Sequence, residues 1–331
     1  MKIIESYINI EKEYQQSVVA IGNFDGIHNG HKSLIRSVID LANAKSKMAG
    51  LITFTPHPRS FFLGGKNFYQ INDENTKQDI LAKHELDILF KISFDEKLSS
   101  MSPDVFFYDV LKNGLNVSHI IVGWDFKFGH KRMGNVDKLR ELAKENNIGF
   151  DAIQKQTNNL SKTYSSSSIR EYLSNGEITK VNKMLGHYWF TMGVVISGAK
   201  KGNEIGFPTI NLRLDSSIKI AHGIYATNVY IQETRYQGAT YYGARPTYNG
   251  SEEFLETYIF DFKGNVYDVE VKIEFIDFVR YDLKYENDYE LKKQMEIDCD
   301  NVLNKLQYYN KNFSRKKILS NFEEIIYSIL D

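Results

Sequence analysis

The stretch "VVAIGNFDGIHNGHKSLI", residues 18–35, places an apolar run directly before three glycines, one acidic residue and two histidines. The apolar run predicts a buried strand, and the spacing of apolar residues after Gly30 predicts a helix. Glycines let the backbone turn sharply between the two elements and approach a ligand closely. The first N–H groups of such a helix point outward without partners, so the turn is expected to bind an anion.

The two histidines of this stretch, His28 and His31, are three residues apart at the helix start. Both imidazoles can therefore face one phosphate and donate hydrogen bonds to its oxygens. A zinc site is disfavoured because a further ligand and the His-Glu-x-x-His pattern are missing. The dinucleotide fingerprint G-x-G-x-x-G does not match the spacing of Gly22, Gly26 and Gly30. Core histidines are also disfavoured beside three glycines, so phosphate chemistry is the best prediction.

Composition narrows the class of protein. The 331 residues, 42% hydrophobic and 25% charged, predict a soluble globular chain of two domains. A formal net charge of -1 argues against an extended nucleic-acid surface. The single Cys299 excludes an intramolecular disulfide and a cysteine-based zinc site. Neither a signal peptide nor an apolar run of about 18 residues is found, so we expect a cytoplasmic protein with no membrane partner.

The chain has two halves with different patterns. Up to about residue 185, short apolar runs alternate with helical segments, which predicts βαβ units and a parallel sheet. The expected strands are 18–21, 51–54, 88–90, 119–122 and 150–153. In such sheets, ligands bind beyond the carboxyl ends of the strands. The motif that begins at Gly22 lies at one of these ends.

The second half predicts a small antiparallel barrel. From about Tyr188 to Arg280, strand-like runs follow one another closely and are separated by Gly and Asn turns. A helical stripe that should dock on the barrel comes next, made of Leu291, Met295, Cys299, Val302 and Leu306. Residues 316–330 are expected to form a further helix. We place the domain boundary at Leu185-Gly186, which gives domains 1–185 and 186–331.

Three further motifs of the first half have physical roles of their own. In "TFTPHP" (53–58), Pro-His-Pro forms a stiff loop after a strand. In "VGWDFKFGHKRMG" (122–134), Asp125 offers a carboxylate beside two phenylalanines, and Arg132 offers a bidentate fork for phosphate. In "SSSSIREYL" (165–173), hydroxyls cap a helix start, and a second set of free N–H groups can meet phosphate.

These four motifs, in this order, resemble the FMN adenylyltransferase (FAD synthetase) module of bacterial bifunctional riboflavin kinase/FAD synthetases. The resemblance implies a Rossmann-like nucleotidyltransferase domain in which His28 and His31 are catalytic. The implied ATP-binding residues are Gly22, Phe24, Asp25, Gly26, Gly30, Ser165, Ser166 and Arg170. The implied flavin-binding residues are Asn23, Pro56, His57, Pro58, Asp125, Phe126, Phe128 and Arg132. Asn135 departs from the family, which more often has Asp there.

"GNEIGFPTINL", residues 202–212, opens the second half. Thr209 and Asn211 leave a hydroxyl and an amide oxygen on one side of an extended segment, and such hard oxygens suit Mg²⁺. Taken alone this signal is weak, since Pro-Thr before a strand usually marks a turn. No G-x-x-x-x-G-K-[ST] sequence occurs, which excludes a kinase of the P-loop type.

The same stretch resembles the Gly-Phe-Pro-Thr-Ala-Asn motif of riboflavin kinases, with Ile210 in place of Ala. The resemblance extends over about residues 15–310 of the chain. It implies that Glu256 is the general base for riboflavin phosphorylation, that Arg280 contacts the flavin, and that Mg-ATP is held by Gly206, Pro208, Thr209 and Asn211, with Thr209 and Asn211 as the metal ligands. Asn203 and Tyr241 depart from the family.

The resemblance implies FAD biosynthesis with Mg²⁺ and ATP: riboflavin is phosphorylated to FMN, and FMN is adenylylated to FAD with release of pyrophosphate. The partners expected are these small molecules alone. Two alternatives stay open. Asn203 and Tyr241 are compatible with a single-activity FAD synthetase whose kinase half is weakened. A non-catalytic flavin-binding sensor would keep both pockets, but the intact His28, His31 and Glu256 argue against it.

Overall fold

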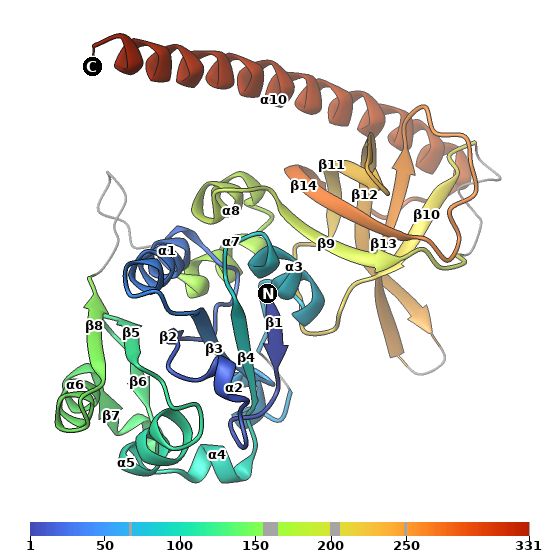
Figure 1. Ribbon diagram of the computed structural model, residues 1–331. Helices are drawn as coiled ribbons and strands as arrows, with labels where there is room; N and C mark the ends of the chain where they lie inside the picture. Colours follow the sequence, from blue (N-terminus) through green and yellow to red (C-terminus); the bar gives the residue numbers. More distant parts are fainter. Residues whose placement is uncertain (66–67, 155–164, 199–205, 248–249, 331) are drawn as a thin grey trace. The chain divides into compact units, whose positions relative to one another are not determined.

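The computed structural model describes residues 1–65, 68–154, 165–198, 206–247 and 250–330. The chain divides into two compact units, Met1–Ser168 and Ile169–Asp331. This division comes earlier in the chain than the predicted boundary at Leu185-Gly186. The helices α7 (Ser166–Ser174) and α8 (Ile178–Leu185) lie before the predicted boundary. Each unit has a sheet of its own, and the two sheets differ in kind (Figure 1).

The first unit contains a six-stranded parallel sheet, which confirms the predicted α/β class. Its strand order is β1-β4-β3-β2-β5-β8. The strands are β1 (Lys2–Ile4), β2 (Val18–Ile21), β3 (Ala49–Thr55), β4 (Ile88–Ser93), β5 (His119–Gly123) and β8 (Gly149–Ile153). β1 was not predicted, because three residues are too few to show a period. β2 is buried along its whole length, as expected for a central strand with both faces covered.

Helices cover both faces of this sheet. On one face, α1 (Asn29–Ala44) packs on β2, β3 and β5 through its buried apolar stripe. On the other face, the core is completed by apolar residues of a π-helical segment (Phe106–Lys112) and of α6 (Val136–Glu145). The shorter elements are α2 (Pro58–Phe62), α3 (Glu74–Ala82), α4 (Glu96–Ser100), α5 (Pro103–Val105), β6 (Lys127–Phe128), β7 (Gly134–Asn135) and the 3₁₀ turns at 12–14 and 130–132.

The second unit is the predicted antiparallel barrel. Its strand order is β10-β13-β12-β11-β14-β9, and a bridge between Ile196 and Asn211 joins the two edges. The strands are β9 (Trp189–Val194), β10 (Thr209–Arg213), β11 (Gly223–Ile231), β12 (Thr234–Thr247), β13 (Gly250–Ile259) and β14 (Glu270–Tyr281). Inside the barrel, the buried hydroxyls of Thr227, Thr240 and Thr257 form a hydrogen-bonded chain with steps of 2.8 and 2.9 Å.

The C-terminal part of the chain is one helix, α10 (Asp288–Leu330), where two separate helical segments were predicted. Neither Gly nor Pro occurs between its ends, so no residue interrupts the hydrogen-bond ladder. Val302 and Leu306 pack on the barrel beside Ile276 of β14, as the predicted stripe requires. Figure 1 shows the helix starting beside β14 and running away from the barrel.

Candidate functional site

The two histidines predicted to be catalytic lie together where β2 passes into α1. His28 is the N-cap of α1, and its Nδ1 accepts a hydrogen bond of 3.3 Å from the backbone N–H of His31. The two imidazoles are stacked, with ring centroids 3.8 Å apart. A neutral ring that accepts at Nδ1 carries its proton at Nε2. His28 Nε2 is therefore a hydrogen-bond donor at the start of a helix.

Burial makes both rings neutral at pH 7. It lowers the pKa of His28 to about 4. The pKa of His31 lies well below its usual range, first because of burial and second because of the neighbouring His28. Within the described chain, the buried Nδ1 of His31 has no hydrogen-bond partner. A phosphate placed here would meet polar ring nitrogens that folding has withdrawn from water.

The glycine loop before α1 is held from within the protein. The Asp25 carboxylate is 4% exposed and accepts a 2.8 Å hydrogen bond from the backbone N–H of Ile71. Gly26 has φ +84°, and a Cβ there would lie 2.7 Å from Cδ1 of Ile71. The Phe24 ring is fully buried, 5.4 Å from the His31 ring. For Phe24 and Asp25, binding of ATP stays a prediction, and it would have to use their backbone.

A second helix start lies at the same loop. The Ser165 hydroxyl accepts a 3.2 Å hydrogen bond from the backbone N–H of Ser168 and so caps α7. The Ser166 hydroxyl donates to the carbonyl oxygen of Asp25 at 2.9 Å. The serine run is therefore an N-cap rather than a linker, and it brings a second helix N-terminus to the loop. Arg170 follows on α7, one turn further along.

The "TFTPHP" motif begins in the last three residues of β3 and continues beyond it at the same edge of the sheet. The Thr53 hydroxyl donates to the carbonyl oxygen of Asn23 at 3.3 Å, which ties β3 to the glycine loop. His57 is 7% exposed and caps α2, because its Nδ1 accepts from the backbone N–H of Arg59 at 3.1 Å. Pro58 is the first residue of α2, and Pro56 before it is exposed. The contact of His57 with the flavin phosphate stays a prediction.

Phe126 and Phe128, the aromatic pair predicted to bind flavin, belong to a larger group of rings. The pair is nearly parallel, with centroids 5.7 Å apart and 14° between the planes. Ring contacts continue from Phe128 through further phenylalanines that sequence reasoning missed, namely Phe106, Phe54, Phe94, Phe61 and Phe62. Phe62 is 66% exposed, which is unusual for a large apolar ring. The available signal was a phenylalanine near the carboxyl end of two neighbouring strands, Phe54 in β3 and Phe94 directly after β4.

The polar residues predicted in the segment 122–134 lie on the surface. Asp125 and Arg132 are both exposed. Asn135, the departure from the family pattern, is the N-cap of α6, and its Oδ1 accepts from the backbone N–H of Lys138 at 2.9 Å. An Asp would accept the same hydrogen bond, so this departure leaves the local structure intact.

In the barrel, three predicted kinase residues come together on one face. Thr209 and Asn211 are two residues apart on β10, so their side chains lie on the same face of the sheet. Asn211 is the direct cross-strand neighbour of Glu256 on β13. Asn211 is 6% exposed. Its buried Oδ1 has no hydrogen-bond partner in the described part of the chain. A buried acceptor of this kind opposite a carboxylate fits a bound cation.

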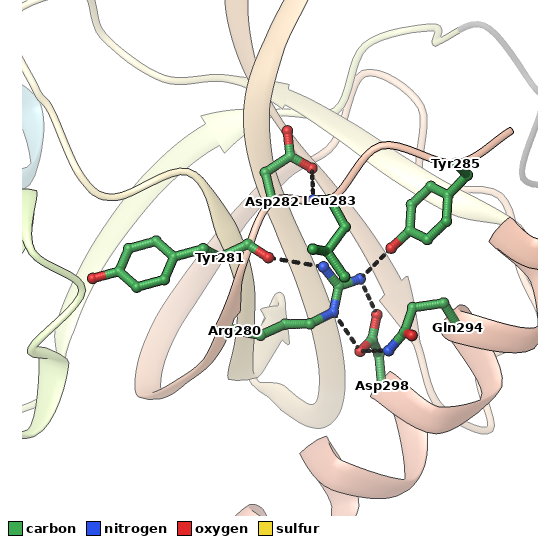
Figure 2. Close-up of polar contacts among 7 residues, drawn as sticks. All are labelled: Arg280, Tyr281, Asp282, Leu283, Tyr285, Gln294 and Asp298. Carbon is green, nitrogen blue, oxygen red and sulfur yellow. Dashed lines mark hydrogen bonds and ion pairs between the residues drawn. The ribbon is translucent and has the colours of Figure 1, made fainter.

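The other predicted kinase residues are more scattered. Gly206 has φ +92°, and among the described residues no atom lies within 4 Å of where its Cβ would be; Pro208 is exposed. Asn203 lies outside the described residues. Arg280, the last residue but one of β14, forms a bidentate ion pair with Asp298 of α10 (Figure 2). Its contact with flavin stays a prediction.

Two kinds of feature are absent from the described residues. No helix among them is both long and apolar enough to cross a membrane. They also contain no group of three or more His, Cys, Asp and Glu side chains that could hold a metal ion.

Comparison with known proteins assigns each half of the chain to a family. Residues 10–168 match the FAD synthetase family, and residues 185–306 match the riboflavin kinase family. The chain is 33% identical to the bifunctional riboflavin kinase/FMN adenylyltransferase of Haemophilus influenzae, over 91% of this chain and 97% of the relative. It is also 33% identical to the protein of the same name from Bacillus subtilis, over 87% and 92% of the two chains.

A solved structure has the same fold over most of the chain. It is described as a macrolide-efflux protein from Streptococcus pneumoniae, with a TM-score of 0.80 and 25% identity, over 92% of this chain and 98% of that one. Each half of the chain thus matches a separate family, and the chain covers nearly the whole length of the two bifunctional relatives. The chain belongs to the bifunctional riboflavin kinase/FMN adenylyltransferase family.

Proposed function

We propose that this chain makes FAD from riboflavin in two ATP-dependent steps, with the barrel forming FMN and the parallel-sheet domain forming FAD. Both family matches and the bifunctional relatives support the two activities. The observation that carries the proposal is that each unit gathers its own set of reactive residues, His28 with His31 in one and Asn211 with Glu256 in the other. The proposed domains are 1–185 and 186–331.

In the adenylyl transfer, a phosphate oxygen of FMN attacks the α-phosphorus of ATP. The new bond is that oxygen to phosphorus, and the bond to the β-phosphate oxygen breaks to release pyrophosphate. No covalent bond to the protein is needed. His28 and His31 would donate hydrogen bonds to oxygens that gain charge, and the starts of α1 and α7 would hold the phosphates. The flavin ring would lie on the aromatic group around Phe126 and Phe128.

The remaining predicted ligands fit around these two groups. Gly30, Ser165 and Ser166 lie at the two helix starts, where backbone N–H groups would meet the triphosphate. Gly22 directly follows β2, and its own N–H donates to the carbonyl oxygen of Ile52 at 3.1 Å, so it would only let the ligand approach the backbone closely. Arg170 would add positive charge from α7. Asn23, Asp125 and Arg132 would contact polar atoms of FMN.

In the phosphorylation of riboflavin, Glu256 would take the proton of the 5′-hydroxyl while that oxygen attacks the γ-phosphorus of ATP. The bond from this phosphorus to the bridging oxygen of the β-phosphate breaks, and ADP leaves. The unpartnered Oδ1 of Asn211 and the hydroxyl of Thr209 suit Mg²⁺, since both are hard oxygen ligands. When bound, Mg²⁺ would supply positive charge against the phosphates. Gly206 and Pro208 would let the nucleotide approach the start of β10 closely.

The comparisons cover the kinase half as well as the synthetase half, so they support neither a single-activity enzyme nor a sensor. We propose that the protein works in the cytoplasm, where ATP is available and a lone Cys299 stays reduced. Its proposed partners are its substrates and products alone.

The full chain should be incubated with Mg-ATP and either riboflavin or FMN, and the flavins resolved by chromatography. We expect FMN and FAD from riboflavin, and FAD with an equal amount of pyrophosphate from FMN. FAD from FMN without any FMN from riboflavin would leave only the single-activity alternative. No product from either flavin would leave only the sensor.

A further inference from the structure

Arg280, expected from the sequence to contact flavin, uses nearly all of its hydrogen-bonding capacity inside the protein. Its Nε donates to Oδ1 of Asp298 at 2.8 Å and its Nη2 to Oδ2 at 2.5 Å, which is a bidentate pair. Nη2 also donates to the Tyr285 hydroxyl at 2.7 Å, and Nη1 to the carbonyl oxygen of Tyr281 at 2.9 Å. A guanidinium has five N–H groups, so these four hydrogen bonds leave one.

The Asp298 carboxylate is likewise hydrogen-bonded within the protein. The Asp298 side chain is 4% exposed, and it also accepts a 3.0 Å hydrogen bond from Nε2 of Gln294, one turn earlier on α10. Figure 2 shows the resulting arrangement, in which one guanidinium joins the end of β14, the Tyr285 side chain and the first turns of α10. Arg280 therefore contacts the segment 282–287, here called the connector, through Tyr285, and it joins the strand before the connector to the helix after it.

The connector is held a second time from the barrel. The Tyr241 hydroxyl on β12 donates to Oδ2 of Asp282 at 3.1 Å, and Oδ1 of Asp282 accepts from the backbone N–H of Leu283 at 2.8 Å. Tyr241 lies along its strand over Gly243, where a Cβ would overlap the Tyr241 ring. The first connector residue thus contacts the strand beside the one that carries Glu256.

Strand register relates these contacts to the proposed kinase residues. Asn211, Glu256, Tyr241, Ile224 and Arg280 are successive cross-strand neighbours on β10, β13, β12, β11 and β14. Direct neighbours point to the same face of a sheet, so the five residues form one row. Glu256 and Arg280 are three strand spacings apart, about 14 Å along the sheet. The connector borders this row at the end opposite to Asn211.

We propose that Arg280 is a positioning residue for riboflavin phosphorylation: paired with Asp298, it holds the connector against the face that carries Glu256, and it does not itself bind the flavin. The proposal rests on the proposed kinase function of the barrel. In this proposal, the Arg280–Asp298 pair determines where riboflavin lies relative to Glu256. The two members of the pair must then act as one unit, because either loss releases the same segment.

The test compares Arg280→Met, Asp298→Asn and the double variant in the full chain, with riboflavin varied at saturating Mg-ATP. We expect each single variant to raise KM for riboflavin about tenfold and to change kcat much less, and the double variant to match the singles. An Arg280 that binds flavin directly would give a different pattern. Asp298→Asn would then leave KM near the parent value while Arg280→Met raised it, and this result would overturn the proposal.

Lys305→Met is the matched control. It removes another ion pair between α10 and β14, Lys305 to Asp277 at 2.5 Å, without touching the connector. We expect it to lower stability and leave KM for riboflavin unchanged. An equal rise of KM in this control would mean that helix docking in general matters, which contradicts the proposal.

FAD formation from FMN should stay at the parent rate in all these variants, which checks that the other domain is intact. A parent chain that forms no FMN would refute the proposed function instead. Hydrogen exchange then decides the positioning role, since Arg280→Met should speed exchange of the Leu283 amide and Lys305→Met should not. Unchanged exchange in Arg280→Met would overturn it.

Discussion

The imidazoles of His28 and His31 are stacked with 10° between their planes, while the backbone N–H of His31 donates to Nδ1 of His28. One histidine therefore caps the helix that carries the other. This arrangement leaves Nε2 of His28 as a donor and keeps both rings neutral at pH 7, because burial lowers the pKa of each.

Replacing both histidines, His28→Ala with His31→Ala, should reduce FAD formation from FMN by about 10³-fold, since donors to a charged transition state typically contribute that much. FMN formation from riboflavin, which uses the other unit, serves as the control and should be unchanged. Both rates can be measured by chromatography of the flavins. A double variant that makes FAD at the parent rate would show that the pair has no catalytic part.

Stability should fall as the pH falls below neutrality. His28 has a pKa of about 4 in the folded chain and 6.5 as its ordinary value, so between these limits the unfolded chain binds more protons. The stabilisation is complete above pH 6.5 and is lost as the pH falls towards 4, by up to about 3 kcal/mol in free energy of unfolding. His31 acts in the same direction.

Hydrogen exchange of β2 and α1 peptides in denaturant at pH 5 and pH 7.5 would measure this loss. His28→Asn keeps a capping side chain and removes the titrating ring, so its pH dependence should be flatter. A parent chain equally stable at both pH values would contradict the expected burial effect.

Gly26→Ala should impair the synthetase site more than a simple backbone effect predicts. The residue has φ +84°, and its new Cβ would overlap Ile71, whose backbone N–H holds Asp25. Gly64→Ala is the matched control, because Gly64 also has positive φ (+59°) but no atom of the described chain lies within 4 Å of its Cβ position. In each variant, backbone strain should lower the free energy of unfolding by about 1 kcal/mol. Only Gly26→Ala should also lower kcat/KM for ATP.

Glu256→Gln should abolish FMN formation and spare FAD formation from added FMN. The amide keeps the size of the side chain but cannot accept the proton of the riboflavin hydroxyl at neutral pH. Both products can be followed in one reaction series with each flavin as the substrate. Retention of most kinase activity in this variant would assign the general base elsewhere.

Asn211→Ala should raise the Mg²⁺ concentration needed for half-maximal kinase activity by about tenfold. It removes the buried oxygen that has no partner in the described chain and lies opposite Glu256. The measurement is a Mg²⁺ titration of FMN formation at fixed ATP. An unchanged Mg²⁺ dependence would mean that Asn211 is not a metal ligand.

The local sequence was sufficient to predict the structure where the reactive residues and the elements that carry them lie in one short segment. The run before Gly22 and the helix after it were predictable because apolar period and capping are properties of neighbouring residues. The change from alternating strands and helices to closely spaced strands likewise indicated two architectures. By contrast, β1 is too short to show a period, and the join between the two predicted C-terminal segments has no breaking residue that would mark a boundary.

Pairings between distant residues were decided only by tertiary structure. The sequence marked Asp25, Asn211, Glu256 and Arg280 as polar residues of recognisable motifs, but an isolated carboxylate or guanidinium looks the same whether it binds substrate or protein. Folding directs Asp25 to the Ile71 backbone and Arg280 to Asp298, and it places Asn211 opposite Glu256. Strand register and burial set these partners. Both depend on how elements far apart in the chain pack together, which the local pattern of residues does not contain.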